Sequence, residues 1–163
     1  MPFHMRRQDK NITDERLLKK ILKTSKYITI ALSMDNAPYL VSLTHGYDEE
    51  HNCVYFHCAK EGKKLHYLKS NRSIWGQALL DYGVSEGQGE CTYLYASVHF
   101  SGKVTLIENL EEKLRGIRFL MDRLDGNSEN RMANVNLNRL KNTVIGRIDI
   151  EYMSGKKSKE VTI

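Results

Sequence analysis

The densest group of chemically useful side chains lies between Tyr55 and Lys64. An apolar run ends there at His57, Gly62 follows, and Lys63 and Lys64 open a segment that can form a helix. A helix N-terminus offers unpaired N–H groups and the positive end of the helix dipole, and the lysines add charge. The pattern predicts a phosphate site. Adjacent lysines on a short helix are more commonly a solvated face, so the motif taken alone leaves both interpretations open.

Other kinds of chemistry find less support in the residues. The phosphate loop of nucleoside triphosphatases is excluded because His57 stands where its first glycine should be and no Ser or Thr follows the lysine. His57 and Cys58 are neighbours on a predicted strand and so point to opposite faces, and no second pair at metal-ligand spacing exists. Neither Ser42 nor Ser101 has the glycine flanks of a nucleophile elbow. We therefore expect no metal centre and no serine-hydrolase site.

The elements that must position these residues are mainly strands. Apolar residues alternate with period two and predict six or so strands, near residues 27–32, 39–44, 54–57, 74–82, 92–107 and 144–150. The fifth is interrupted at Gly102 and so consists of the runs 92–100 and 103–107. Turn residues at 35–36 and 48–52 predict that the first three form an antiparallel meander, since short turns join neighbouring strands. Gly102 predicts a bulge or bend between two of the later runs.

Helical spacing occurs in three segments only. It predicts helices at 13–24, with Thr13 as N-cap, at 63–71, and at 109–124, where residues 109–112 form a capping box. We expect residues 126–138 to form a loop with a broken helical turn, and residues 154–159 to form a basic tail. Antiparallel strands with only peripheral helices predict a mainly β fold, a small closed or nearly closed β-barrel, because curling removes exposed edges.

Length and composition predict one globular domain covering residues 1–163. With 163 residues and 40% apolar residues, the chain can bury a core without disulfides or a structural metal. No apolar run is long enough to span a bilayer, and residues 1–10 are charged where a signal peptide would be apolar. The three cysteines cannot all pair within one chain. We therefore expect a cytoplasmic protein with reduced thiols and no membrane partner.

The charge balance is mildly basic. The chain has 25 Lys and Arg against 20 Asp and Glu, a formal net charge of +5. Proteins that bind single-stranded nucleic acid have a stripe of basic residues with aromatic residues between them. The basic residues of this chain are scattered along the sequence and form no such stripe. Nucleic acid is therefore a disfavoured partner.

Several segments together resemble a known family. In chain order they are residues 5–7, 38–43, 55–64, 97–102 and 148–156. The chain resembles the pyridoxamine 5′-phosphate oxidase-related flavoproteins, and within them the nitroimidazole-resistance-like branch. The resemblance extends over nearly the whole chain, and the segment from His57 to Lys64 is its most specific part.

The resemblance implies a split β-barrel homodimer that binds FMN, occasionally FAD, at the subunit interface. It implies that Leu40, Val41, Ser42 and Leu43 contact the isoalloxazine through their backbone, that Phe56 and His57 lie beside the ribityl chain, that Lys63 and Lys64 hold the phosphate, and that His99 from the second subunit closes the pocket. The phosphate predicted from the residues and the phosphate implied by the family thus fall on the same lysines.

Two departures from the family pattern bear on function. Ser42 stands where this branch often has proline, so the contacts of that strand with the ring are expected to differ. Residues 153–156 lack the aromatic and arginine side chains that the true oxidases place around their vitamin substrate, which argues against vitamin B6 oxidation. Some relatives in the resistance branch use the histidine that corresponds to His57, next to the flavin, for substrate or cofactor chemistry, and the resemblance therefore implies a catalytic role for His57.

The function implied is that of a flavin-dependent oxidoreductase acting on a small-molecule oxidant such as a nitroaromatic compound. A bound flavin performs the electron transfer, so the lack of a familiar set of catalytic side chains is no objection. The alternative is a flavin-binding carrier or redox sensor without turnover, which requires the same pocket. The sequence leaves the physiological substrate, the electron donor and the choice between FMN and FAD open.

Overall fold

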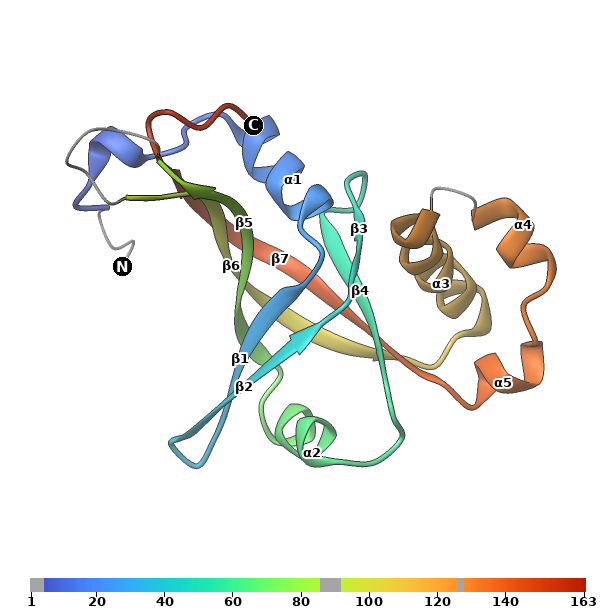
Figure 1. Cartoon of the computed structure of the whole chain (residues 1–163). Coiled ribbons are helices and arrows are strands. Elements are labelled where there is room, and N and C mark those ends of the chain that lie inside the picture. Colours follow the sequence, from blue (N-terminus) through green and yellow to red (C-terminus); the bar gives the residue numbers. More distant parts are fainter. Residues whose placement is uncertain (1–4, 86–91, 126–127) are drawn as a thin grey trace.

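The computed structural model describes residues 5–85, 92–125 and 128–163. Its centre is one antiparallel sheet with the strand order β2-β1-β5-β6-β7-β4-β3 (Figure 1). The strands are β1 (Ile28–Met34), β2 (Ala37–Leu43), β3 (Gly46–Asp48), β4 (Cys53–Cys58), β5 (Ser73–Val84), β6 (Tyr93–Ile107) and β7 (Val144–Lys157). The helices are the short 3-10 helix η1 (Gln8–Lys10) and α1 (Glu15–Thr24), α2 (Lys63–Ser70), α3 (Leu110–Asp125), α4 (Ser128–Ala133) and α5 (Leu137–Lys141). The mainly β fold predicted from the sequence is confirmed.

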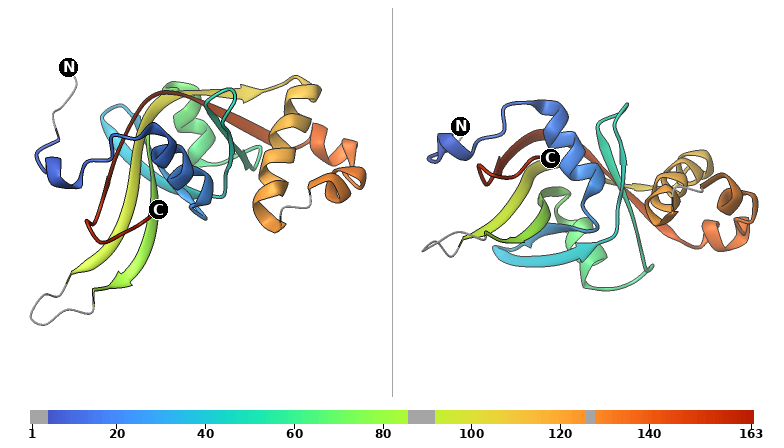
Figure 2. Two further views of the ribbon diagram at one scale, coloured as in Figure 1. Left: turned by 90° about the horizontal axis from the view of Figure 1, so that it is seen from above. Right: turned by 45° about the horizontal axis from the view of Figure 1, so that its top comes forward.

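The helices sit around the sheet. Helix α2 lies below the hairpin of β1 and β2, while α1 lies near the other end of β5 (Figure 1). Helices α3, α4 and α5 gather at the far end of the sheet from the tip of β5 and β6, as both views of Figure 2 show. No helix within the described ranges combines the length and apolar character needed to cross a bilayer.

A two-residue turn sets the register of β1 and β2. Asp35 and Asn36 both have positive φ, 49° and 61°, as a type I′ turn requires. Because hydrogen-bonded and non-hydrogen-bonded pairs alternate from the turn onward, the backbone groups of Pro38, Leu40 and Ser42 point away from β1. Pro38 has no N–H to leave unpaired there, which suits an edge strand. Strand β2 therefore presents a row of free backbone groups at the edge of the sheet.

The predicted three-stranded meander is wrong. Strand β4 does not pair with β2: it pairs with β7 along its whole length and with the short β3 at its first half. Because residues 44–52 turn back as β3 and occupy one edge of β4, while β7 occupies the other, β2 keeps an open edge. The curled sheet is thus split between β2 and the second half of β4.

Of the predicted bulge and helix caps, two are confirmed and one is wrong. The bulge at Gly102 is confirmed, because the register of β6 against β7 shifts between Ser101 and Gly102. The side chain of Asn109 accepts a hydrogen bond from the Glu112 amide, as a cap at the start of α3. The N-cap of α1 is Asp14 and not Thr13, since the Asp14 carboxylate accepts the hydrogen bond from the Arg16 amide.

Two predicted irregular segments are ordered elements. For residues 126–138 the sequence predicts a loop with a broken helical turn, but the structure has more helix than that, since α4 and the start of α5 lie among the described residues 128–138. Residues 126 and 127 lie outside the described ranges. The asparagine-rich composition partly explains α5, because Asn136 caps it by accepting from the amides of Asn138 and Arg139. Residues 154–157, expected in a tail, continue β7 opposite β6, which supplies ladder partners as far as Lys157.

Two phenylalanine rings fill the barrel by lying against glycines of the paired strand. A Cβ on Gly146 would come within 2.2 Å of the Phe56 ring, and a Cβ on Gly76 would come equally close to the Phe100 ring. Phe56 and Phe100 are fully buried, and each is the register partner of its glycine. The width of the barrel at these two places is therefore set by an aromatic ring packed on bare backbone.

We expect Gly146→Ala to lower the free energy of unfolding by about 1–3 kcal/mol, because the added methyl group overpacks the core against the Phe56 ring. Urea unfolding measures the effect. Lys20→Ala, at an exposed position of α1, is the control and should change stability by no more than about 0.5 kcal/mol. Equal stability of the two variants would contradict this packing.

Candidate functional site

The first turn of α2 has free backbone donors. Gly62 precedes it with φ of 129°, a conformation that favours glycine, and no side chain caps the helix. The first hydrogen bond of the helix is donated by the His66 amide to the Gly62 carbonyl, so the amides of the three residues between them have no partner within α2. These amides and the helix dipole favour an anion.

The two lysines of this turn stand on aromatic rings. Lys63 is exposed, and its Nζ lies 4.5 Å from the centre of the Tyr39 ring on β2. Lys64 is half-buried, with its Nζ 5.7 Å from the centre of the Phe56 ring on β4. Among the described residues no carboxylate forms an ion pair with either lysine. Helix α2 therefore spans the split between β2 and β4 and brings two uncompensated positive charges to it.

Strand β2 presents its free edge beside this helix. The side chains of Leu40 and Ser42 are exposed, whereas Leu43 is buried and Val41 is half-buried. The Ser42 hydroxyl lies 2.9 Å from that of Thr29 on β1. The free N–H and C=O groups of Leu40 and Ser42 form a short row of donors and acceptors that a planar polar ring can meet edge-on.

Strand β4 alternates between two sides. Phe56 points into the barrel core, while His57 lies on the other face, which also carries the buried Tyr55 and Cys53 under α3. Any contact of Phe56 with a ligand outside the barrel must therefore come from its backbone. Burial raises the pKa of the Cys58 thiol, and the charge of Lys64 opposes this effect.

His57 lines a cavity of about 570 Å³ between the split of the barrel and the helices α3 and α5. We call this space the α3 cavity. Thr44, directly after β2, lines it as well, so the cavity adjoins the ends of both strands that border the split. The remaining lining residues are Lys26, Tyr27, His45, Ile117, Leu120, Met121, Arg123, Arg139 and Thr143.

His45 is a fully buried histidine on the wall of the α3 cavity. Its Nε2 donates to the Leu22 carbonyl at 2.7 Å, because a carbonyl only accepts. Its Nδ1 is then an acceptor, and it has no partner. Burial lowers the pKa of His45 to about 4, opposed by the hydrogen bond to Leu22 and supported by the nearby charge of Arg123. His45 is therefore neutral at neutral pH.

His99 lies apart from the other predicted site residues. It is on β6, half-buried, between Gln77 of β5 and Ser154 of β7. Burial, with a smaller effect from Lys156, lowers its pKa. The register runs from His99 through Gln77 and Thr29 to Ser42, which is three strand spacings or roughly 14 Å. His99 does not reach the β2 edge of its own chain.

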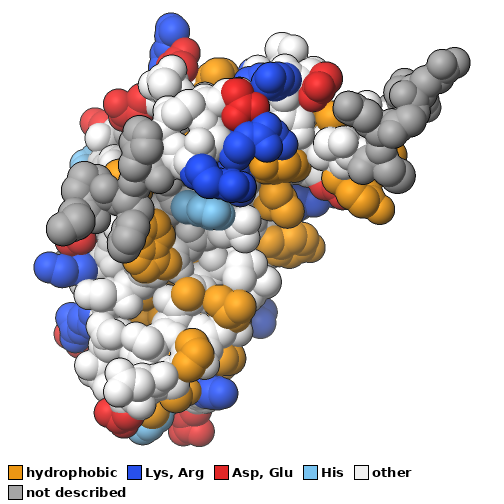
Figure 3. Space-filling view, turned by 90° about the vertical axis from the view of Figure 1, so that its left-hand side faces the viewer, with side chains coloured by type: hydrophobic (Ala, Val, Ile, Leu, Met, Phe, Trp, Pro, Cys, Tyr) orange, Lys and Arg blue, Asp and Glu red, His pale blue; other side chains and the backbone are white. Residues whose placement is uncertain are grey.

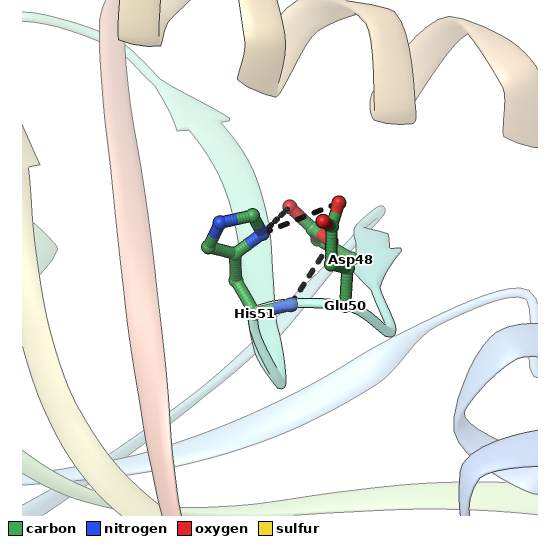
Figure 4. A group of neighbouring side chains, drawn as sticks. All are labelled: Asp48, Glu50 and His51. Carbon is green, nitrogen blue, oxygen red and sulfur yellow. Dashed lines mark hydrogen bonds and ion pairs between the residues drawn. The ribbon is translucent and has the colours of Figure 1, made fainter.

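A separate group of Asp48, Glu50 and His51 has the residue types of a metal site (Figure 4). The positive charge that a metal ion would bring to this group is already supplied by Arg115 of α3. The Nη2 atom of Arg115 lies 2.6 Å from Asp48 Oδ2 and 2.7 Å from His51 Nδ1. Although burial acts to raise the pKa of Asp48, the hydrogen bonds from Arg115 hold it below the usual range. We interpret this group as a clamp that fixes α3 on the β3–β4 turn.

The structure brings most of the predicted site residues together. Residues of β2, the end of β4 and the start of α2 surround the split, and His99 is the exception. Sequence reasoning missed the α3 side of the site, namely His45, Arg123 and Arg139. The helical repeat of α3 was visible in the sequence, but it does not reveal that part of its face borders a cavity.

Comparison with known proteins gives one family. The sequence profile of the family described as pyridoxamine 5′-phosphate oxidase matches residues 14–157. No curated protein matches the chain.

Solved structures share the fold. One is a proposed 5-nitroimidazole antibiotic resistance protein from Bacteroides thetaiotaomicron, with 20% identity, 90% of this chain and 86% of that chain covered, and a TM-score of 0.79. Another is the flavocytochrome Anf3 from Azotobacter vinelandii, with 20% identity, coverage of 95% and 72%, and a TM-score of 0.78. A third is an FAD and heme binding protein from Mycobacterium smegmatis, with 19% identity, coverage of 94% and 76%, and a TM-score of 0.78. At these identities the likeness shows the fold.

The buried His45 should make stability depend on pH. Its folded pKa of about 4 lies below the usual value near 6.5, so the unfolded chain binds the proton first as the pH falls. We expect His45 to lower the free energy of unfolding by up to about 3 kcal/mol between pH 7 and pH 4. Urea unfolding at both pH values measures this loss. His45→Gln, which keeps a donor for Leu22 but does not titrate, should lose less stability over this range, and an equal loss would rule His45 out as the cause.

Proposed function

Since the chain belongs to the pyridoxamine 5′-phosphate oxidase family, we propose that it is a flavoprotein that binds FMN at the split between β2 and β4, with FAD as the alternative. The observation that carries the proposal is the open edge of β2 next to the free N-terminus of α2. One offers hydrogen bonds for a planar ring, and the other offers positive charge for a phosphate. A flavin mononucleotide has these two parts joined by a short chain.

The phosphate is assigned to the start of α2. The free amides of its first turn, together with Lys63 and Lys64, supply donors and charge, and no carboxylate of the described residues competes there. Gly62 carries no side chain that would keep a phosphate from these amides.

The isoalloxazine is assigned to the backbone of Leu40, Val41, Ser42 and Leu43. Within this stretch, Leu40 and Ser42 have the N–H and C=O groups that β1 leaves unpaired. Backbone groups at this edge satisfy the ring whatever the side chain is, so serine in place of proline at position 42 adds one N–H donor to the row.

Bound flavin supplies the transfer of a hydride or of single electrons, and we propose that the protein uses it as an oxidoreductase on a small-molecule oxidant. The residues of the chain bind and orient the cofactor. His57 is exposed at the end of β4 on the face toward the α3 cavity, and we assign it to the substrate side. The flavocytochrome and the FAD and heme binding protein that share the fold support a flavin here.

The alternative is a carrier or redox sensor that binds flavin without turnover. Both functions need the same pocket, so the distinction is kinetic. Oxidation of NADH or NADPH in the presence of a nitroaromatic compound, beyond one equivalent of bound flavin, identifies an enzyme. A single equivalent identifies a carrier or sensor.

The phosphate assignment predicts that Lys63→Ala with Lys64→Ala weakens FMN binding at least tenfold, because each charge-assisted hydrogen bond is worth about 1.5–3 kcal/mol. Quenching of flavin fluorescence on titration measures the affinity. Riboflavin, which lacks the phosphate, should bind the wild type and the variant equally.

Lys19→Ala with Lys20→Ala on α1 is the matched control and should leave FMN affinity unchanged. If the variant at positions 63 and 64 lost riboflavin and FMN affinity alike, or neither, the phosphate would lie elsewhere. If the wild type purified without pigment and bound neither FMN nor FAD, the flavin itself would be rejected.

We also propose that the protein is a homodimer formed through the outer face of the sheet. The pairing across β2, β1, β5, β6 and β7 aligns Leu40, Ala31, Trp75, Ser101 and Tyr152 on this face. Leu40, Trp75 and Tyr152 are 66%, 54% and 43% exposed, and the rings of Trp75 and Tyr152 are 6.1 Å apart.

An apolar row of this kind on a sheet face is typical of a protein interface. Figure 3, seen from the side of β1 and β5, shows hydrophobic side chains spread over this face next to a histidine and basic side chains. A second copy packed face to face brings the His99 of one chain toward the β2 of the other, which the distance within one chain does not allow.

The dimer is tested by Leu79→Glu, which places a charge on the outer face at a residue that is 52% exposed. Sedimentation should find the wild type as a dimer and this variant as a monomer with weaker FMN binding. Leu137→Glu changes a leucine of α5 with 49% exposure, away from the face, and should remain a dimer. A monomeric wild type would contradict the proposal.

A further inference from the structure

The α3 cavity has a lining of one charge sign. The charged residues of its walls are Lys26, Arg123 and Arg139, and no described residue that lines it is acidic. His45 and His57 add polar groups. Its volume of about 570 Å³ is within the range of small-molecule sites.

Three acidic side chains of α3 lie on other surfaces, away from the α3 cavity. Glu111 and Glu112 line a separate cavity of about 590 Å³ together with Arg115 and Arg118. Asp122 lines a third cavity of about 400 Å³, next to Asp48. The face toward the barrel keeps the apolar residues Ile117, Leu120 and Met121. The two other cavities along α3 are lined by residues of both charge signs, whereas the described charged residues that line the α3 cavity are all basic.

Arg123 places a fixed positive charge in this wall. Its guanidinium donates to the Lys23 carbonyl at 2.6 Å and to the carbonyls of Thr24 and Ser25, at the end of α1. Within the described ranges no carboxylate pairs with it. Burial lowers the pKa of Arg123. Arg123 also borders the third cavity, but it forms no ion pair with the carboxylates in that lining, which are Asp48, Glu49, Glu50 and Asp122. The carbonyl groups at the end of α1 hold the Arg123 side chain in place but do not neutralise its charge.

Polar and apolar parts of the cavity lie at different places. The three apolar side chains of α3 form one wall, whereas Lys26 precedes β1 and Arg139 belongs to α5. A ligand with a flat apolar body and one negative group satisfies both parts. A neutral ligand leaves the charges without a counterion, and a purely ionic one leaves the apolar wall exposed to water.

We infer that the α3 cavity is the substrate pocket and that it selects small aromatic anions, with the ring against α3 and the negative group toward Lys26 and Arg139. This inference rests on the proposed flavin site, because the cavity reaches that site through His57 and Thr44. It narrows the substrate class from any small oxidant to an anionic aromatic one.

The test compares two probes of nearly the same shape, 4-nitrobenzoate and 4-nitrobenzamide, by calorimetric titration of the flavin-loaded protein at low ionic strength. We expect the anion to bind at least tenfold more tightly. Lys26→Gln with Arg139→Gln should remove most of this preference and leave the affinity for the amide unchanged. Arg118→Gln, on the other side of α3, is the control and should behave as the wild type.

The outcomes separate this inference from the flavin proposal. Equal binding of the two probes, or no saturable binding by protein that holds its flavin, would overturn the inference alone. Loss of FMN affinity in the Lys26→Gln, Arg139→Gln variant would also overturn it, since the cavity would then belong to the cofactor. A preference for the anion in a protein that binds no flavin would overturn the flavin site and the substrate role together, leaving an anion pocket.

Discussion

An antiparallel sheet that stops short of closure leaves a row of backbone N–H and C=O groups without partners, and in this protein that row belongs to β2. The rest of the architecture is arranged around it. The short β3 takes the partner position on β4 that β2 was expected to hold, and α2 spans the resulting split. On most sheets, free backbone groups at an edge promote pairing with other chains. Here they lie beside a helix N-terminus, and we propose that the two together bind a polar ring and its phosphate.

The position of helix α3 determines which residues of β4 are covered and which face the α3 cavity. The helix is fixed to the β3–β4 turn by Arg115 and Asp48, and Gly116 lets it lie close to the Tyr55 ring. Held in this position, it covers Cys53 and Tyr55 on the outer face of β4 and leaves His57, the next residue on that face, open to a cavity. The same alternation that buries Phe56 in the barrel thus directs His57 outward.

Features fixed by neighbouring residues were predictable from the sequence. The turn at Asp35 and Asn36, the bulge at Gly102 and the cap of α3 at Asn109 depend on local backbone geometry, and so does the glycine-lysine start of α2. The partner of β4 was not predictable, because β7 begins 86 residues after Cys58 and nothing local specifies such a pairing. The basic lining of the α3 cavity was not predictable for the same reason, since its residues come from five separate segments.

The glycine-phenylalanine contacts carry a consequence for how this fold diverges. Phe56 with Gly146 and Gly76 with Phe100 join positions that are far apart along the chain but opposite in register. A change in the size of one member costs stability unless the other changes as well, so the two members of a pair are expected to change together. Relatives at about 20% identity are therefore expected to differ at these places by paired replacement, and such covariation reveals strand register even where the remaining similarity has faded.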